Sequence, residues 1–165
     1  MSPRIAYRQA GAEDARFLTE MLSEAAAWQP NAIPSVDGVL ANPFFARYVI
    51  GWPRIGDHGI IALDGSDPIG AAWYRHFTDS DRGFGFVAPS IPELSIAVVS
   101  GRRQRGVGRG LLRELLHAAA MNDCAQISLS VEPENPARHL YESLGFRVVG
   151  TDGGACTMLA ETTSN

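Results

Sequence analysis

The stretch Arg103-Gln104-Arg105-Gly106-Val107-Gly108-Arg109-Gly110 lies between a predicted strand over 93–99 and a predicted helix. The helix is predicted from apolar residues that recur on one face: Leu111, Leu112, Leu115, Leu116 and Ala119. The first backbone N–H groups of a helix have no partner within the helix, and they lie at the positive end of its dipole. Glycines let phosphate oxygens approach these groups, and the nearby arginines add positive charge. The stretch therefore predicts a binding site for a di- or triphosphate.

Two better-known glycine motifs do not match this stretch. The dinucleotide fingerprint G-x-G-x-x-G fails because, counted from Gly106, its third glycine falls at Leu111. The nucleoside-triphosphate loop fails because the sequence has no Gly-Lys pair here. A glycine-rich turn with solvated arginines is the alternative interpretation, and the position between a strand and a helix favours the phosphate site over it.

The elements on either side of this turn predict an α/β (α+β) fold. A short strand over 4–8 precedes an amphipathic helix that carries Phe17 and Leu22, and two small helices are expected after Ser35 and Asn42. The other predicted elements are strands over 59–63 and 68–74 joined as a hairpin, a strand over 127–132, a helix over 135–144, and strands over 146–149 and 156–160. This order predicts a mixed sheet with helices on its faces.

Length and composition set limits on the class of protein. A chain of 165 residues, 45% hydrophobic and 19% charged, predicts one soluble domain over 1–165. The net charge of -4 argues against a nucleic-acid partner, and the apolar residues are too dispersed for a membrane span. Cys124 and Cys156 lack metal-type spacing, so we expect buried thiols and no metal. The first residues contain neither a basic leader nor an apolar signal core, which predicts a cytoplasmic protein.

Two segments together resemble one protein family. The spacing Arg103-x-x-Gly106-x-Gly108 resembles the Arg/Gln-x-x-Gly-x-Gly/Ala signature of the GNAT superfamily of N-acetyltransferases. The segment 130–146 is similar to a later block of that family, in which a strand is followed by an Asn at a helix start, a Tyr and a Gly-Phe exit. The resemblance is strong over 93–150 and weak in the first half of the chain. It implies a mostly antiparallel central sheet with a parallel pair in the middle, and acetyl-coenzyme A as co-substrate.

The resemblance also implies which residues hold the coenzyme. In the family the glycine turn binds the pyrophosphate, a role that falls here on Arg103, Gln104, Arg105, Gly106, Val107, Gly108, Arg109 and Gly110. Main-chain groups of Ile96, Ala97 and Val98 would bond to the pantetheine arm. Asn135 is a further candidate for coenzyme contact, although its position before a helix is equally explained by capping.

Two residues are candidates for the chemistry. By resemblance, Tyr141 would protonate the departing thiolate, and a phenol near pKa 10 can act as such an acid although the proton moves uphill. The alternative for Tyr141 is a packed aromatic residue. By resemblance, Glu93 would take the amine proton through water, and the alternative is a solvated residue at a strand end.

The acceptor is the least defined part of the prediction. Aromatic residues at Trp28, Phe44, Phe45, Tyr48 and Trp52, with Asp79, Asp81, Phe84 and Phe86 in the loop over 78–92, would suit a cationic amine with an apolar body. The leading hypothesis is an N-acetyltransferase that acts on a small-molecule or peptide amine by direct transfer. A non-catalytic acyl-coenzyme-A sensor and a nucleotide-binding protein are the alternatives. Dimers are common in the family, so a homodimer is also expected.

Overall fold

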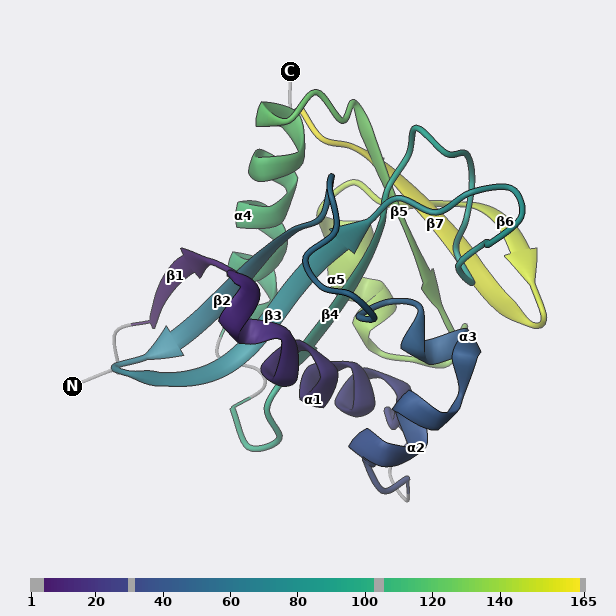
Figure 1. Cartoon of the computed structure of the whole chain (residues 1–165). Helices are drawn as coiled ribbons and strands as arrows, with labels where there is room; N and C mark the ends of the chain where they lie inside the picture. The colour runs from purple at the N-terminus through teal and green to yellow at the C-terminus, as the bar shows by residue number, and fades with distance from the viewer. Residues whose placement is uncertain (1–4, 30–31, 103–105, 164–165) are drawn as a thin grey trace. The chain divides into compact units, whose positions relative to one another are not determined.

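The computed structural model describes residues 5–29, 32–102 and 106–163. The order of elements confirms the prediction, with boundaries shifted by a few residues (Figure 1). The elements are β1 (Ile5–Gln9), the 3-10 helix η1 (Ala12–Asp14), α1 (Ala15–Ala26), α2 (Val36–Ala41), α3 (Pro43–Ala46), β2 (His58–Asp64), β3 (Asp67–Arg75), β4 (Glu93–Val98), α4 (Val107–Met121), β5 (Gln126–Val131), α5 (Ala137–Ser143), β6 (Arg147–Asp152) and β7 (Ala155–Glu161).

The strands form one seven-stranded sheet in the order β1-β2-β3-β4-β5-β7-β6. β1 pairs with β2, β5 with β7, and β6 with β7 in antiparallel fashion, whereas β4 and β5 are parallel. Only two residues connect β2 to β3, which is the connection of an antiparallel hairpin. The expected mixed, mostly antiparallel sheet with a parallel pair in the middle is therefore confirmed.

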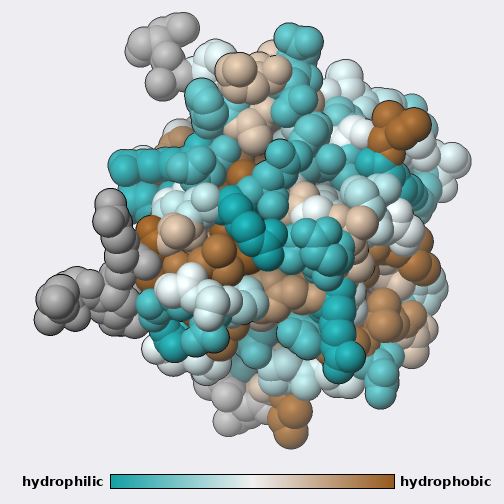
Figure 2. All heavy atoms as spheres, turned by 60° about the vertical axis from the view of Figure 1, so that its left-hand side comes forward, coloured by the Kyte–Doolittle hydropathy of each residue, from teal (hydrophilic) through white to brown (hydrophobic). Residues whose placement is uncertain are grey.

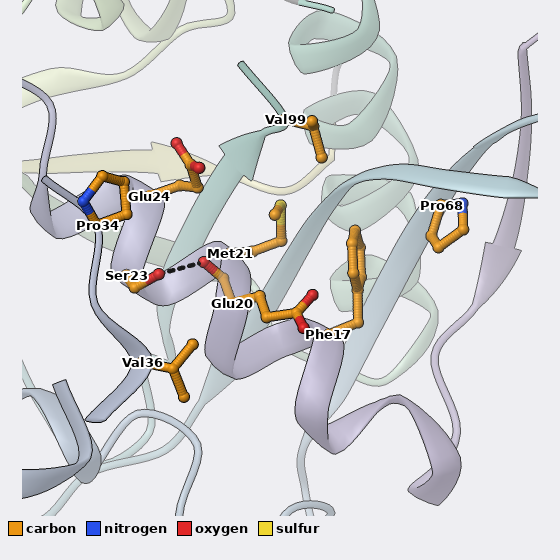
Figure 3. A pocket seen from close by; sticks show the side chains of 9 residues that line it. All are labelled: Phe17, Glu20, Met21, Ser23, Glu24, Pro34, Val36, Pro68 and Val99. Atoms are coloured by element: carbon orange, nitrogen blue, oxygen red, sulfur yellow. Dashed lines mark hydrogen bonds between the residues drawn. The ribbon is translucent and has the colours of Figure 1, made fainter. Parts of the chain in front are cut away.

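Contacts within the chain group it into two compact units, and the first comprises the described residues of 1–73 and 95–115. In this unit α1 lies on one face of the strands and α4 on the other, as Figures 1 and 3 show. Leu18 of α1, Ile61 of β2 and Leu111 of α4 are fully buried and belong to its core. The first unit thus has the expected helices on both faces of its strands.

Local hydrogen bonds explain why the short elements of the first unit form. The Ser35 hydroxyl accepts a hydrogen bond from Gly38 N at 3.0 Å, and Asn42 Oδ1 accepts one from Phe44 N at 3.0 Å. These are the two predicted helix caps, and each satisfies an N–H group that the helix leaves unpaired. Arg8 donates two hydrogen bonds to the Asp14 carboxylate, at 2.8 and 2.9 Å, and so fixes η1 to β1.

The second unit comprises the described residues of 74–94 and 116–165. Its strands β5, β7 and β6 are antiparallel neighbours, and β7 is buried from Ala155 to Ala160. The loop over 76–92 is held in place on β5, since Ser128 Oγ donates to Gly85 O at 2.8 Å. A Cβ at Gly85 would lie 2.6 Å from the carbonyl carbon of Leu129, so only glycine allows this approach.

The surface is predominantly hydrophilic on the face drawn in Figure 2, where hydrophobic residues form separate small groups. In the first unit the exposed large hydrophobic residues gather between residues 33 and 55. They are Ile33, Leu40, Phe44, Ile50 and Ile55. Within the part of the chain that the structure describes, no helix is both long and apolar enough to span a membrane.

Candidate coenzyme-binding and catalytic residues

The predicted phosphate turn leads into the first turn of α4. Gly106 directly precedes the helix with a φ of 76°, a left-handed conformation that favours glycine. Gly110 N donates to Gly106 O at 3.0 Å. An α-helix bonds each N–H to the carbonyl four residues earlier, and the N–H groups of Val107, Gly108 and Arg109 precede this bond. Among the described residues the structure gives them no acceptor, so they can serve an external one.

The packing of α4 fixes the direction of these N–H groups. Val107 is 1% exposed, and Leu111, Leu112 and Leu115 are fully buried, so the predicted apolar face is the face that packs on the sheet. A Cβ at Gly110 would overlap the Tyr7 hydroxyl of β1, which means that helix and strand meet at this glycine. Gly110 therefore has a packing role, separate from any contact with coenzyme.

The chain before the turn is also anchored. Arg102 ion-pairs with Asp64 at the end of β2, and its N–H donates to Val99 O at 3.0 Å. Gly101 has a φ of 88°, which allows the tight reversal after β4. Arg103, Gln104 and Arg105, the remaining predicted phosphate contacts, lie outside the described residues.

The expected pantetheine contacts lie on β4 in the same unit. Ala97 and Val98 are buried and Ile96 is half-buried. A Cβ at Gly70 would lie 3.1 Å from Ala97 O, and Val99 N donates to Ile69 O at 2.8 Å, so β3 is tightly packed against this end of β4. The first unit therefore holds the predicted contacts at 96–98 and 106–110.

Tyr141 lies in the second unit, on α5, and is only 8% exposed. Its ring packs edge-on against Phe146 with a centroid distance of 6.0 Å, and its carbonyl accepts a hydrogen bond from Phe146 N at 3.1 Å. Gly145, with a φ of 94°, ends the helix in a left-handed conformation that makes this fold-back possible. Burial raises the pKa of Tyr141 to about 12, so the phenol keeps its proton at neutral pH.

Glu93 also belongs to the second unit, at the first position of β4. Its side chain is 3% exposed, so the alternative of a solvated strand-end residue is wrong. The backbone around it is fixed by the parallel pair, in which Glu93 lies opposite Ser128 and Ser128 N donates to Pro92 O at 2.9 Å. Buried carboxylates in proteins are paired with other groups, and the same unit buries a cation, Arg75, at the end of β3.

Asn135 caps α5, as predicted, although the helix begins at Ala137. Its Oδ1 accepts a hydrogen bond from Ala137 N at 3.0 Å. Pro136 is the residue directly before the helix, with a φ of -63°. The cap gives Asn135 a structural role, and coenzyme contact is a separate expectation.

Two groups in the second unit were not predicted from the sequence. The Ser128 hydroxyl is fully buried and holds the loop over 76–92 through Gly85. Cys124 Sγ lies 3.8 Å from His76 Nε2, while His76 Nδ1 lies 3.0 Å from Pro89 O. Burial raises the pKa of the Cys124 thiol, and Cys124 and Cys156 are both free. Only long-range contacts reveal these groups, which leave no local sequence pattern.

The predicted acceptor residues have different environments. Tyr48 and Trp52 are buried, and the Trp52 indole N–H donates to Gly11 O at 3.1 Å. Phe44 is 60% exposed, with the Arg47 guanidinium 5.5 Å from its ring centre. In the second unit, Asp79 and Asp81 are exposed. The aromatic residues of the first unit are therefore partly core and partly surface.

A cavity of about 460 Å³ in the first unit contains none of these predicted acceptor residues. Its lining consists of Phe17, Glu20, Met21, Ser23, Glu24, Pro34, Val36, Pro68 and Val99. Figure 3 shows that Phe17 and Met21 of α1 point toward the same space as Val99, with Glu20 and Glu24 one helical turn apart. The cavity thus combines apolar walls with two carboxylates.

Among residues 5–29, 32–102 and 106–163, no group of three or more His, Cys, Asp or Glu side chains is placed to hold a metal ion.

Comparison with known proteins identifies the family. The sequence model of the acetyltransferase (GNAT) family matches residues 21–146, which include all of α4 and α5. The chain belongs to the acetyltransferase (GNAT) family. This is the family that the two sequence segments resemble.

Individual relatives agree with this assignment. The GNAT chain is 33% identical over 101 residues, 59% of its length, to a mycothiol acetyltransferase from Corynebacterium kroppenstedtii. It spans about a quarter of that relative, since the match covers 27% of the longer protein.

Solved structures share the fold at lower identity. One is yncA from Salmonella typhimurium, solved with its cofactor acetyl-CoA, with a TM-score of 0.66, 23% identity, and coverage of 98% of this chain and 95% of that chain. Another is the paia N-acetyltransferase from Thermoplasma acidophilum in complex with coenzyme A. Its TM-score is 0.69 at 19% identity, and the match covers 96% of this chain and 99% of that chain.

Proposed function

We propose that this GNAT protein transfers an acetyl group from acetyl-coenzyme A directly to a primary amine. The observation that carries the proposal is the first turn of α4, where three N–H groups precede the bond from Gly110 N to Gly106 O, the first one that the described residues make. A diphosphate fits such a turn because it accepts several hydrogen bonds and carries negative charge. The acetyl-coenzyme A complex of a protein with the same fold supports this coenzyme.

When bound, acetyl-coenzyme A supplies an activated acyl group as a thioester. The chain's own part begins with the N–H groups of Val107, Gly108 and Arg109, which would hold the diphosphate. Main-chain groups of 96–98 would orient the arm, and β4 is rigid enough to do so because β3 packs closely on it at Gly70. This division of roles places binding on backbone groups and leaves side chains for the chemistry.

Tyr141 would hold the proton that the departing sulfur receives. Its pKa of about 12 keeps the phenol protonated until a thiolate forms beside it. With a thiol of pKa near 8.5, transfer of the proton is uphill by about 3.5 units, or roughly 5 kcal/mol. Proton transfer must therefore accompany the breaking of the C–S bond, so that the favourable collapse to the amide offsets this difference.

Glu93 would accept, through water, the proton that the ammonium group loses before attack, because only the neutral amine has the lone pair that forms the C–N bond. The second proton, which the nitrogen loses as the amide forms, would restore the Tyr141 phenol. The position of Glu93 at the start of β4 is fixed by the parallel pairing with Ser128, and its burial removes it from competing bulk water. The cavity of about 460 Å³ beside α1 supports a cationic amine with an apolar body as the acceptor, since Glu20 and Glu24 in its lining would attract the ammonium group. We also propose a cytoplasmic location, which two free, buried cysteines support.

The proposed function is tested by a thiol-release screen of acetyl-coenzyme A with small amines, amino acids, aminoglycosides and peptides. We expect release with at least one amine class, and a 10- to 1,000-fold lower kcat in Tyr141→Phe. Coenzyme affinity should be unchanged in that variant, because Tyr141 does not contribute to the phosphate site. Unchanged turnover would remove Tyr141 from the mechanism.

A non-catalytic acyl-coenzyme-A sensor would share the phosphate site but not the chemistry. If acetyl-coenzyme A binds and neither Tyr141→Phe nor Glu93→Gln alters thiol release with any amine, the sensor hypothesis replaces the enzyme. Competition between coenzyme A and ATP distinguishes the enzyme and the sensor from a nucleotide-binding protein. For either of the first two, ATP should not displace coenzyme A.

A further inference from the structure

Ser128 of β5 binds a segment of the loop over 76–92 at two points. Its hydroxyl donates to Gly85 O at 2.8 Å, and its N–H donates to Pro92 O at 2.9 Å. Pro92 is joined directly to Glu93, the candidate base. One fully buried residue therefore holds this segment both where it approaches β5 and where it enters β4.

The pairing of β4 with β5 places the side chains of Glu93 and Ser128 on one face of the sheet. The two residues lie opposite each other in the parallel register. Side chains of directly paired residues project to the same side, from strands that lie about 4.8 Å apart. Since the Ser128 hydroxyl reaches Gly85 O, the turn that contains Gly85 lies on the face from which the Glu93 side chain projects.

This turn, over residues 83–86, lies directly on the backbone of β5. A Cβ at Gly85 would be 2.6 Å from the carbonyl carbon of Leu129, so the two backbones are too close for a water molecule to lie between them. Gly83 and Gly85 are buried, and Phe86 N donates to Gly83 O at 3.3 Å across the turn. The turn over 83–86 is therefore packed against β5.

A third contact fixes the loop beyond the turn. His76 Nδ1 lies 3.0 Å from Pro89 O, and because a carbonyl oxygen can only accept, the ring donates through Nδ1. The loop is thus bound at Gly85, Pro89 and Pro92. Glu93 follows the last of these residues and is 3% exposed. A loop bound at three points next to a buried carboxyl group acts as a fixed wall beside that group.

We propose that Ser128 is a positioning residue for Glu93, because its hydroxyl holds the turn over 83–86 beside the carboxyl group and so confines the water through which Glu93 takes the ammonium proton. The inference rests on the proposed acetyl transfer, in which Glu93 acts through water. Proton transfer through water requires a base held within reach of one positioned water molecule, which a fixed wall provides and mobile solvent does not. Without the hydroxyl, the Gly85 carbonyl loses its partner and the turn moves to bind water instead.

Amide hydrogen exchange tests the fixed turn without any assay of activity. In Ser128→Ala, exchange at the Phe86 amide should be at least about 10-fold faster, because the turn opens once Gly85 O has lost its donor. The amide at position 128 should keep its protection, since its bond to Pro92 O does not need the hydroxyl. Ser90→Ala is the matched control, because it removes an exposed hydroxyl of the same loop and should leave both amides unchanged.

Two amines of different basicity separate a positioning role from a structural one. At pH 8, 2-phenylethylamine is almost entirely an ammonium ion, since its pKa is that of an alkylamine, about 10. Its β,β-difluorinated analogue is largely neutral, because fluorine withdraws electron density from the nitrogen. Ser128→Ala should lower kcat/KM about 10- to 100-fold for the first amine and less than about 3-fold for the second, which needs no base. Gly85→Ala displaces the same turn by another route and should show the same pattern.

A double variant shows whether Ser128 acts through Glu93. In a Glu93→Gln background, Ser128→Ala should cause no further loss, because the two residues serve one step. Losses that multiply in the double variant, or an equal loss for both amines in Ser128→Ala, would reduce Ser128 to a structural residue and overturn the proposal. Unchanged exchange at Phe86 in Ser128→Ala would overturn it as well.

Failure of the proposed acetyl transfer has a different signature. If the unaltered chain acetylates no amine, the transfer fails and the positioning role of Ser128 fails with it, whatever the exchange at Phe86 shows. If the unaltered chain acetylates an amine and only the predictions for Ser128→Ala fail, the transfer stands and this inference alone is refuted.

Discussion

Removing the Tyr141 hydroxyl should change how the protein responds to alkaline pH. The buried phenol has a pKa of about 12, against an ordinary value of 10.0. A pKa raised by folding means that the native state resists loss of the proton that the unfolded chain releases. The stabilisation is therefore fully present below pH 10 and is lost as the pH rises from 10 toward 12.

The size of the loss follows from these two pKa values. At pH 11 the phenol of Tyr141 is about nine-tenths ionised in the unfolded chain and about one-tenth ionised in the native protein. The free energy of unfolding should then have fallen by about 1 kcal/mol through this residue, approaching about 3 kcal/mol well above pH 12. Tyr7 and Tyr74, whose pKa values burial also raises, add losses of their own.

Urea unfolding of the unaltered protein and Tyr141→Phe, at pH 8 and pH 11, isolates this contribution. At pH 8 the two should be nearly equally stable, because no hydrogen bond of the Tyr141 hydroxyl is found within the described residues. At pH 11 the unaltered protein should have lost about 1 kcal/mol more than the variant. Equal losses in the two proteins would show that Tyr141 titrates as an exposed phenol, and its assignment as a buried acid would fail.

Three further changes test the packing around the candidate sites. Gly110→Ala should destabilise the protein by about 1–3 kcal/mol, because the added Cβ overlaps with Tyr7. In a Tyr7→Ala background only the helix propensity of alanine remains, so the same change should stabilise the protein by up to about 1 kcal/mol. Thermal unfolding that shows the same sign of the effect in both backgrounds would contradict this. Gly85→Ala should lower the stability by about 1–3 kcal/mol, because the added Cβ meets the Leu129 backbone. Gly150→Ala is the control, since a Cβ there meets open space and should not lower the stability. Equal melting temperatures of the two variants would refute the close approach at Gly85. The pKa of Asp14 lies below 3.8, chiefly because Arg8 on β1 donates hydrogen bonds to its carboxylate. The stabilisation that this carboxylate provides is therefore present above pH 3.8 and is lost as the pH falls through the lowered pKa. On acidification, Asp14→Asn should lose less stability than the unaltered protein.

Local patterns predicted the elements that local forces determine. The apolar face of α4, the caps at Ser35 and Asn42, and the exit at Gly145 each depend on residues within a few positions of one another. These are interactions that periodicity and helix-end preferences encode directly. The mixed sheet followed because the order of the elements allows few topologies.

Long-range packing explains what the sequence left open. The burial of Glu93 depends on neighbouring strands, so a position after Pro92 suggested a solvated residue where the structure has a buried one. The approach of Gly85 to β5 joins residues more than forty positions apart, as the hydrogen bond from Ser128 shows. Gly110 looked like part of a phosphate motif, but its contact with Tyr7 appears only when α4 lies on β1.

The central claim is that the backbone at the start of α4 holds the diphosphate of the coenzyme. Calorimetric titration with acetyl-coenzyme A should show at least a ~100-fold loss of affinity in Gly108→Val, because a branched side chain blocks approach to the N–H groups. Arg113→Val, at an exposed site on the same helix, places the same side chain away from the turn and should bind normally.

A crystal structure of the acetyl-coenzyme A complex tests this claim most directly. The account predicts diphosphate oxygens at about 2.7–3.2 Å from the main-chain nitrogens of Val107, Gly108 and Arg109. A complex whose diphosphate lies elsewhere, with these three nitrogens bonded to groups of the protein, would contradict it.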